Sequence, residues 1–193
     1  HRAAALDVLS RSAAVQLFVE RAQANKPGFA LNDKEAPAVA ELVARLEGIP
    51  LALELAAARV RTLSVADINA RLKDRYKLLT GGGRVLLERQ QTLRALVDWS
   101  YDLLPEHEQI LLARLSAFAG GFDLAAAELV CGTEPLAPED VVDLLVSLVD
   151  KSLVMPEESE SGTRYRMLET IRDYARIKLI ERGDLEQVSS RHC

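Results

Sequence analysis

The residues best suited to chemistry in this sequence are glycines and carboxylates that could hold a phosphate group and its magnesium ion. A phosphate-binding loop requires the spacing Gly-x-x-x-x-Gly-Lys-Ser/Thr, because backbone N–H groups and the lysine surround the phosphates. The run Gly81–Gly83 is followed by Arg84 and not by Lys-Ser/Thr, so this spacing is absent. The apolar residues 144–149 precede Asp150 as in a magnesium-holding strand, but they recur at helical spacing. The sequence therefore predicts that this chain cannot hydrolyse ATP unaided.

Other catalytic and metal-binding patterns are also missing from the sequence. It contains no Gly-x-Ser-x-Gly run and no histidine beside a plausible serine or cysteine nucleophile. His1, His107 and His192 lack the spacing of metal ligands on a helix. Cys131 and Cys193 are far apart, so reduced thiols are expected in place of a disulfide framework. We expect no catalytic residue, no metal site and no enzymatic activity.

Helices must position any binding site that the chain has. Aromatic residues make up 5% of the 193 residues and charged residues 27%, which favours helices packed through aliphatic faces. Apolar residues recur at three- and four-residue steps in four successive segments of the N-terminal part. These segments are 12–24, 37–46, 50–61 and 64–72. They predict a four-helix subdomain over residues 1–80.

The tightest junction between these helices is Gly48-Ile49-Pro50. Gly48 can adopt the left-handed conformation that ends a helix, and Pro50 suits the first turn of the next helix because its missing N–H has no partner there. The following residues 51–58 are apolar except for Glu54, which predicts a helix buried on nearly all sides. Such a corner fixes the angle between two helices and could support a site.

The glycine run predicts a linker over residues 81–89 and a second domain over 90–186. Helices are expected from Thr92, from Pro105, and over 123–130, 138–149 and 168–181. Short β-like runs at 153–155 and 165–167 enclose a polar tip and read as a hairpin. Three helices followed by a hairpin are typical of a winged-helix domain. We expect a mostly α fold with this small hairpin, and a disordered tail over 187–193.

Several motifs in a fixed order resemble those of another group of proteins. The segment Gly48-Ile49-Pro50-Leu51-Ala52-Leu53-Glu54-Leu55 looks like the GxP motif of bacterial STAND-class (NB-ARC-type) signal-transduction ATPases. Further matches are Arg89–Arg94, Trp99–Leu104, Phe118–Phe122, Ser147–Val154 and Arg164–Arg172. Together they cover residues 12–182, and so many ordered matches are more specific than any single motif.

The resemblance implies binding residues for ATP or ADP in an intact parent protein. In that class the proline of GxP packs on the adenine, which assigns Gly48 and Pro50 to the nucleotide side. Met167-Leu168-Glu169 aligns with the Met-His-Asp motif, whose histidine contacts the β-phosphate. Leu168 cannot donate a hydrogen bond, so this contact must be absent, weaker or replaced. Without phosphate donors, no nucleotide is expected to bind this fragment tightly.

The resemblance further implies a non-catalytic, nucleotide-sensing arm of a bacterial transcriptional regulator. Its expected partner is the P-loop core of the same polypeptide, with homo-oligomers forming on activation. Two alternatives stay open, a DNA-binding winged-helix module and a plain protein-interaction scaffold. Direct DNA contact is not expected, because the helix at the recognition position carries Glu139, Asp140 and Asp143.

Charge and hydropathy indicate the compartment. The net charge of −5 favours neither nucleic acid nor an anionic membrane as partner. The sequence has no apolar run approaching the length of a membrane span and no secretion signal at its start. We expect a cytoplasmic protein without a membrane partner.

Overall fold

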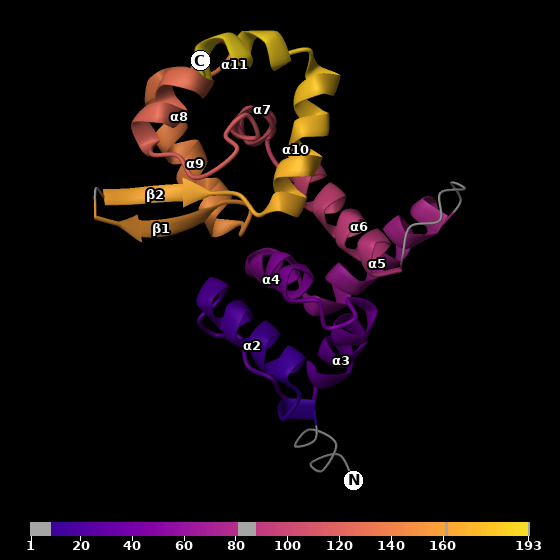
Figure 1. The fold of residues 1–193 in the computed structure, drawn as a ribbon. Helices are drawn as coiled ribbons and strands as arrows, with labels where there is room; N and C mark the ends of the chain where they lie inside the picture. Colours follow the sequence, from indigo (N-terminus) through magenta and orange to yellow (C-terminus); the bar gives the residue numbers. More distant parts are fainter. Residues whose placement is uncertain (1–8, 81–87, 161, 193) are drawn as a thin grey trace. The chain divides into compact units, whose positions relative to one another are not determined.

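A computed structural model describes residues 9–80, 88–160 and 162–192 (Figure 1). The chain divides into two compact units, residues 1–100 and 101–193, and each is described separately. The described residues are mostly helical and contain one two-stranded hairpin, which confirms the expected fold class. Most of the expected linker, residues 81–89, lies outside the described residues.

The first unit is a set of helices with an aliphatic core. Its elements are α2 (Ala13–Asn25), α3 (Ala36–Arg45), α4 (Pro50–Ala58), the short 3-10 helix η1 (Arg59–Arg61), α5 (Val65–Thr80) and most of α6 (Glu88–Asp102). Helix α4 packs against α2, and α3 packs against α5. Phe18, Leu42, Leu53 and Ile68 are fully buried in this core, so the apolar spacing seen in the sequence corresponds to the inward faces.

Helix α6 belongs to the first unit as far as Ser100, whereas the sequence predicts that the second domain begins at residue 90. Buried Arg59 donates a hydrogen bond from Nη2 to the carbonyl oxygen of Ser100 at 3.0 Å. Buried Thr92 contacts the Glu47 carboxylate through its hydroxyl at 3.5 Å. The Thr92 contact joins α6 to the GxP corner, and the Arg59 bond joins α6 to η1. Both connect residues that are more than 40 positions apart in sequence.

The second unit is built around one central helix. Its elements are α7 (Glu106–Leu115), α8 (Leu124–Cys131), η2 (Pro138–Asp140), α9 (Val141–Asp150), β1 (Met155–Ser159), β2 (Gly162–Arg166), α10 (Glu169–Arg182) and α11 (Leu185–His192). Figure 1 shows α7 in the middle of this unit, and it packs against α8, α9 and α10. Leu111, Leu112 and Leu115 of α7 are fully buried. This arrangement of three helices followed by a hairpin and a closing helix is a winged helix.

The hairpin lies further along the chain than the sequence predicts. Leu153 and Val154, expected in the first strand, precede β1 and are almost fully buried. Strand β1 instead contains Glu157 and Glu158, which were expected in the tip, and it pairs antiparallel with β2 from Met155↔Arg166 to Ser159↔Gly162. Leu153 and Val154 therefore pack in the core, while the polar and exposed strands β1 and β2 are held together by backbone hydrogen bonds.

The C-terminal tail is also different from the expectation. Residues 185–192 form α11, so the prediction of disorder over 187–193 is wrong for the described residues. Val188 is fully buried, and α11 packs against α8. Helix α10 ends at Gly183, which has a left-handed conformation with φ of 77°, as glycine allows. Tertiary packing therefore stabilises a helix too short to form alone.

Candidate functional sites in the two units

The GxP corner of the first unit has the tight geometry that its sequence indicates. Glu47 and Gly48 both have positive φ, 52° and 63°, and the Gly48 N–H bonds the Val43 carbonyl at 3.2 Å. Pro50 opens α4, and the Ile49 carbonyl accepts the Leu53 N–H at 3.0 Å. The chain thus ends one helix and starts the next within two residues, so the direction of α4 is fixed.

The two ends of this corner differ in what they offer a ligand. Pro50 is exposed, so its ring can take part in stacking, while the helix behind it is buried on nearly every side. Glu54, the single charged residue of α4, pairs with Arg21 of α2 at 3.4 Å. The corner presents an apolar surface without a free cation of its own, which suits a ring more than a phosphate.

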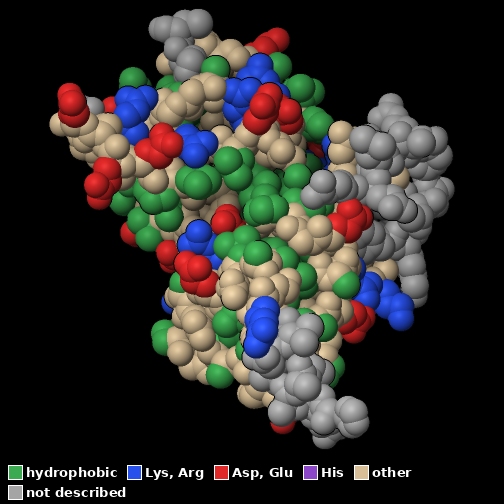
Figure 2. Space-filling view, turned by 60° about the horizontal axis from the view of Figure 1, so that its bottom comes forward, with side chains coloured by type: hydrophobic (Ala, Val, Ile, Leu, Met, Phe, Trp, Pro, Cys, Tyr) green, Lys and Arg blue, Asp and Glu red, His purple; other side chains and the backbone are tan. Residues whose placement is uncertain are grey.

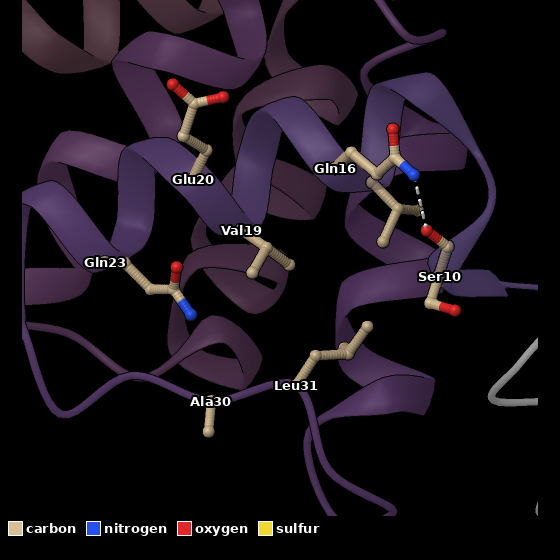
Figure 3. Close-up of a pocket in the computed structure, with 8 residues that line it drawn as sticks. Ser10, Gln16, Val19, Glu20, Gln23, Ala30 and Leu31 are labelled. Atoms are coloured by element: carbon tan, nitrogen blue, oxygen red, sulfur yellow. Dashed lines mark hydrogen bonds between the residues drawn. The ribbon is translucent and has the colours of Figure 1, made fainter.

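A hollow beside α2 is the second feature of the first unit (Figure 3). It has a volume of about 470 Å³ and lies between α2 and the residues that follow it. Figure 3 shows Gln16 bonded to the Ser10 carbonyl, at 3.1 Å, and Gln23 also donates its amide to the Phe29 carbonyl, at 3.3 Å. Glu20 is the single charged residue among the described residues that line it. Both amides donate to carbonyls of the protein itself, and the described lining contains no lysine or arginine that could hold a phosphate.

The hairpin-to-helix junction of the second unit contains Leu168. This residue is half-buried and is the N-cap of α10, where it offers no side-chain capping bond; its carbonyl accepts the Arg172 N–H at 2.9 Å. Ile171 is almost fully buried. Leu168 contributes to the junction through packing and backbone, which is all that a leucine can do there.

A cavity of about 430 Å³ opens beside this junction. It is lined by the turn 119–121, Arg166, Met167, Glu169 and Arg172, and Leu168 is not part of the lining. Arg172 donates from Nη1 to the Ala119 carbonyl at 2.6 Å, and Arg166 pairs with Glu157 across the hairpin. The cavity therefore combines two guanidinium groups and one carboxylate at the start of a helix.

Sequence reasoning did not assign a role to the two arginines of this cavity. Both lie in the motif Arg164–Arg172, but only their placement against the turn 119–121 reveals them as lining residues. Arg164 supports the same turn by donating from Nη2 to the Gly121 carbonyl at 2.6 Å. Of the three residues expected on the nucleotide side, Gly48 and Pro50 share one corner, and Leu168 belongs to the other unit.

Helix α9 occupies the recognition position of the winged helix. Val141, Leu145 and Leu148 face the core. Buried Glu108 of α7 accepts a hydrogen bond from Ser147 Oγ at 2.7 Å and an ion pair from Lys151 Nζ. The inner face of α9 is therefore held by apolar packing and by one buried carboxylate.

The outward side of the same helix is acidic. Glu139, Asp140, Asp143 and Asp150 are exposed on η2 and α9, and the wing adds exposed Glu157 and Glu158. In the view of Figure 2, acidic and basic side chains are mixed and the described residues form no continuous basic band. Phosphate contacts in protein–DNA complexes come mainly from Lys and Arg.

The described residues contain no group of three or more His, Cys, Asp or Glu placed to hold a metal ion. Within the same residues, no helix combines the length and the hydropathy that crossing a membrane requires. Cys131 is a free, buried thiol, and burial raises its pKa to about 12. A thiol in this state is a structural residue and not a nucleophile at neutral pH.

The arrangement of the second unit agrees with a comparison of the sequence with protein families. Residues 104–180 match the winged helix-turn-helix domain. The matched segment runs from the residue before Pro105 into the last turns of α10 and so contains the winged-helix core just described. The first unit lies outside this match.

Similar proteins occur in mycobacteria. The chain is 51% identical over 179 residues to Rv0890c of Mycobacterium tuberculosis and to Mb0914c of Mycobacterium bovis, both provisionally named HTH-type transcriptional regulators. The alignment covers 93% of this chain and 20% of each of those proteins. Rv0894 of Mycobacterium tuberculosis, an uncharacterized protein, is 42% identical over 180 residues, which are 46% of its length. The chain thus spans about a fifth of the length of the two relatives named as transcriptional regulators.

Proposed function

We propose that this chain is a non-enzymatic regulatory segment of a bacterial transcriptional regulator and that its winged helix works through protein contacts. The match to a winged helix-turn-helix domain and the names of the relatives support a role in transcription. The observation that supports protein contacts over DNA contacts is the acidic outer side of α9. A helix that entered a DNA groove with this face would oppose the phosphates.

The finer part of the proposal is that the segment responds to a nucleotide. Its support is the ordered set of STAND-type motifs in the sequence, together with the rigid GxP corner and its exposed Pro50 ring. Gly48 and Pro50 would contact adenine, and the junction at Leu168 would lie toward the phosphates. ATP or ADP would be held mainly by a P-loop core elsewhere in the same longer polypeptide, and exchange would change how the two units engage that core.

The cavity beside Leu168 fits this role in part. Arg166 and Arg172 supply positive charge close in sequence to Leu168, although Leu168 does not line the cavity and each arginine also bonds a group of its own unit. The carboxylate of Glu169 lines the same cavity and would repel a bound phosphate. We therefore expect weak nucleotide binding by the isolated chain and stronger binding only when a P-loop core completes the site.

The test is a calorimetric titration of the chain with the P-loop region of the longer protein, in ADP, in ATP and without nucleotide. The proposal predicts association that depends on the nucleotide. Pro50→Ala should weaken it by about tenfold, since a stacking surface is lost. Pro37→Ala is the matched control, because Pro37 is an exposed proline in the first turn of α3. Association that ignores the nucleotide, or an equal effect of both substitutions, would contradict the switch.

Direct DNA binding is the second candidate function. The family match and the names of the relatives favour it more directly than they favour a nucleotide switch. Its test is a gel-shift titration of the chain with duplex DNA of mixed sequence at low salt. A shift that disappears at high salt and is weakened by Arg164→Ala, on the wing, would establish this function; no shift at the lowest salt would remove it.

A further inference from the structure

The outer side of α9 combines exposed valines with carboxylates in a single stripe. Glu139 of η2 and Val142, Val146 and Asp150 of α9 follow one another at three- and four-residue steps. Asp143 lies beside Val142, four residues after Glu139 and three before Val146, so all five share one side of the helix. Val142 is 36% and Val146 51% exposed, so the two valines form a small apolar patch one turn apart on the helix. We call these five residues the α9 face.

The charge of the α9 face is not balanced by its surroundings. Among the described residues, none of its three carboxylates forms an ion pair. Lys151, the residue after Asp150, forms an ion pair with buried Glu108. The face therefore presents negative charge around an apolar centre, with the nearest lysine in sequence held on the inner side of the helix.

Helix stability explains only part of this charge. Glu139 and Asp143 lie near the positive N-terminal end of the helix, where carboxylates are favourable. Asp150 is the last residue of α9, where the helix dipole disfavours a negative charge. Val146 gains nothing from exposure in the middle of the helix. Helix stability therefore does not account for these two residues.

The α9 face is also held in place before any partner arrives. Val141, Leu145 and Leu148 are buried beneath it, and Ser147 and Lys151 both bond Glu108 of α7. A face on a short, doubly anchored helix loses little conformational entropy on binding. It therefore resembles a formed docking surface more than a mobile segment.

We propose that the α9 face binds an amphipathic basic helix of a partner protein. Two aliphatic side chains of that helix would pack on Val142 and Val146, and lysine or arginine side chains on either side would pair with Glu139, Asp143 and Asp150. This is the helix-on-surface mode of recognition, with charge complementarity selecting the partner. DNA and anionic membranes carry the wrong charge for this face. The inference deepens the proposed function, because it names a surface and the chemistry of its partner.

The test uses the full 193-residue chain and a fluorescein-labelled model peptide. The peptide has about five helical turns, with leucines along one stripe and lysines on both sides, and its companion carries glutamate in place of every lysine. We expect the lysine peptide to bind in fluorescence anisotropy and to shift the ¹H–¹⁵N resonances of α9. Val146→Ser with Asp143→Asn should weaken binding by about tenfold or more.

Matched substitutions on another helix control for general loss of surface charge or hydrophobicity. Ile180 is 57% exposed on α10 and Asp173 is exposed on the same helix, so Ile180→Ser with Asp173→Asn removes the same group types elsewhere. This variant should bind the lysine peptide within about twofold of the original chain. Because all four positions are exposed, both variants should fold, which thermal unfolding will check.

Several results would overturn the inference. These are no binding of the lysine peptide at low salt, equal binding of the glutamate peptide, equal weakening by the α10 variant, resonance shifts that spare α9, or α9 shifts caused by duplex DNA or by self-association. Failure here is distinguishable from failure of the proposed function. The nucleotide-dependent association with a P-loop region uses a different partner and can succeed when the peptide does not bind.

Discussion

Arg114 offers the sharpest test of how the second unit is held together. It is 1% exposed on α7, and its guanidinium donates to acceptors from two distant segments. Nη1 bonds the Cys131 carbonyl at 2.9 Å and the Thr133 carbonyl and hydroxyl at 2.6 and 3.0 Å. Nη2 bonds the Glu134 carbonyl at 2.9 Å, and Nε pairs with Asp184 at 3.1 Å. One side chain thus fixes the loop after α8 and the turn before α11.

Arg114→Met preserves much of the volume and removes every one of these bonds. Three carbonyl groups lose the Arg114 donor, but the Cys131 carbonyl keeps the Thr133 N–H and the Thr133 carbonyl keeps the Leu136 N–H. Each lost bond therefore costs about 1 kcal/mol, the ordinary net contribution of a hydrogen bond. Asp184 is 24% exposed, so water can partly solvate its carboxylate and its contribution is smaller. We expect a loss of about 2–4 kcal/mol in the free energy of unfolding, since several hydrogen bonds from one charged donor disappear together.

The assay must report on the second unit alone, because the chain has two units. Native-state hydrogen exchange of α7 amides does so, with urea unfolding followed by circular dichroism as the global measure. The matched control is Arg176→Met on the exposed side of α10, expected within about 0.5 kcal/mol of the original protein. A loss below about 1 kcal/mol for Arg114→Met, or one equal to that of the control, would refute this reasoning.

Three further predictions concern single positions. Gly48→Ala should lower the free energy of unfolding by about 1 kcal/mol, because φ is 63° there, while Gly28→Ala, which has open space and no positive φ, should cost less in the same urea titration. Cys131 should resist a thiol reagent at pH 8 until urea unfolds the chain, because burial raises its pKa to about 12. Mass spectrometry of the Cys193→Ser variant will measure the labelling of Cys131 alone, and rapid labelling of the native protein would contradict this prediction. Hydrogen bonds from Ser64 lower the pKa of the Asp67 carboxyl, so this cap stabilises the fold above the carboxyl's unfolded pKa and the contribution is lost as pH falls through the lowered value. Ser64→Ala should raise that pKa in an NMR titration, and an unchanged value would show that the bonds do not form in solution.

Local chemistry explains why some boundaries could be predicted from the sequence. Gly48 and Gly183 both end helices with positive φ, and Pro50 begins one, as the conformational preferences of these residues require. The nearly continuous burial of α4 also follows from its composition, since only Glu54 is charged in that helix. Each of these features depends on residues within one turn of the position concerned.

Other features depend on residues far apart in sequence and could not be read from it. Strand β1 contains Pro156 and two glutamates, which are poor strand formers, and it exists because its backbone pairs with β2. The turn 119–122 is held to the hairpin by paired backbone bonds between Phe122 and Tyr165, at 2.7 and 2.8 Å. The cavity beside Leu168 arises from this pairing, which is why its two arginines were missed as lining residues.

The bonds from Ser147 and Lys151 to Glu108, which orient α9, also determine which charges the helix presents to a partner. The winged-helix fold places α9 outward whatever its side chains are, so the fold alone does not select DNA or protein. Glu108 draws Lys151 inward and leaves Asp143 and Asp150 without a neighbouring lysine on the outer side. A groove of phosphates would meet negative charge there, and a basic helix would meet two exposed valines between carboxylates. The buried carboxylate on α7 thus connects the packing of the core to the choice of partner at the surface.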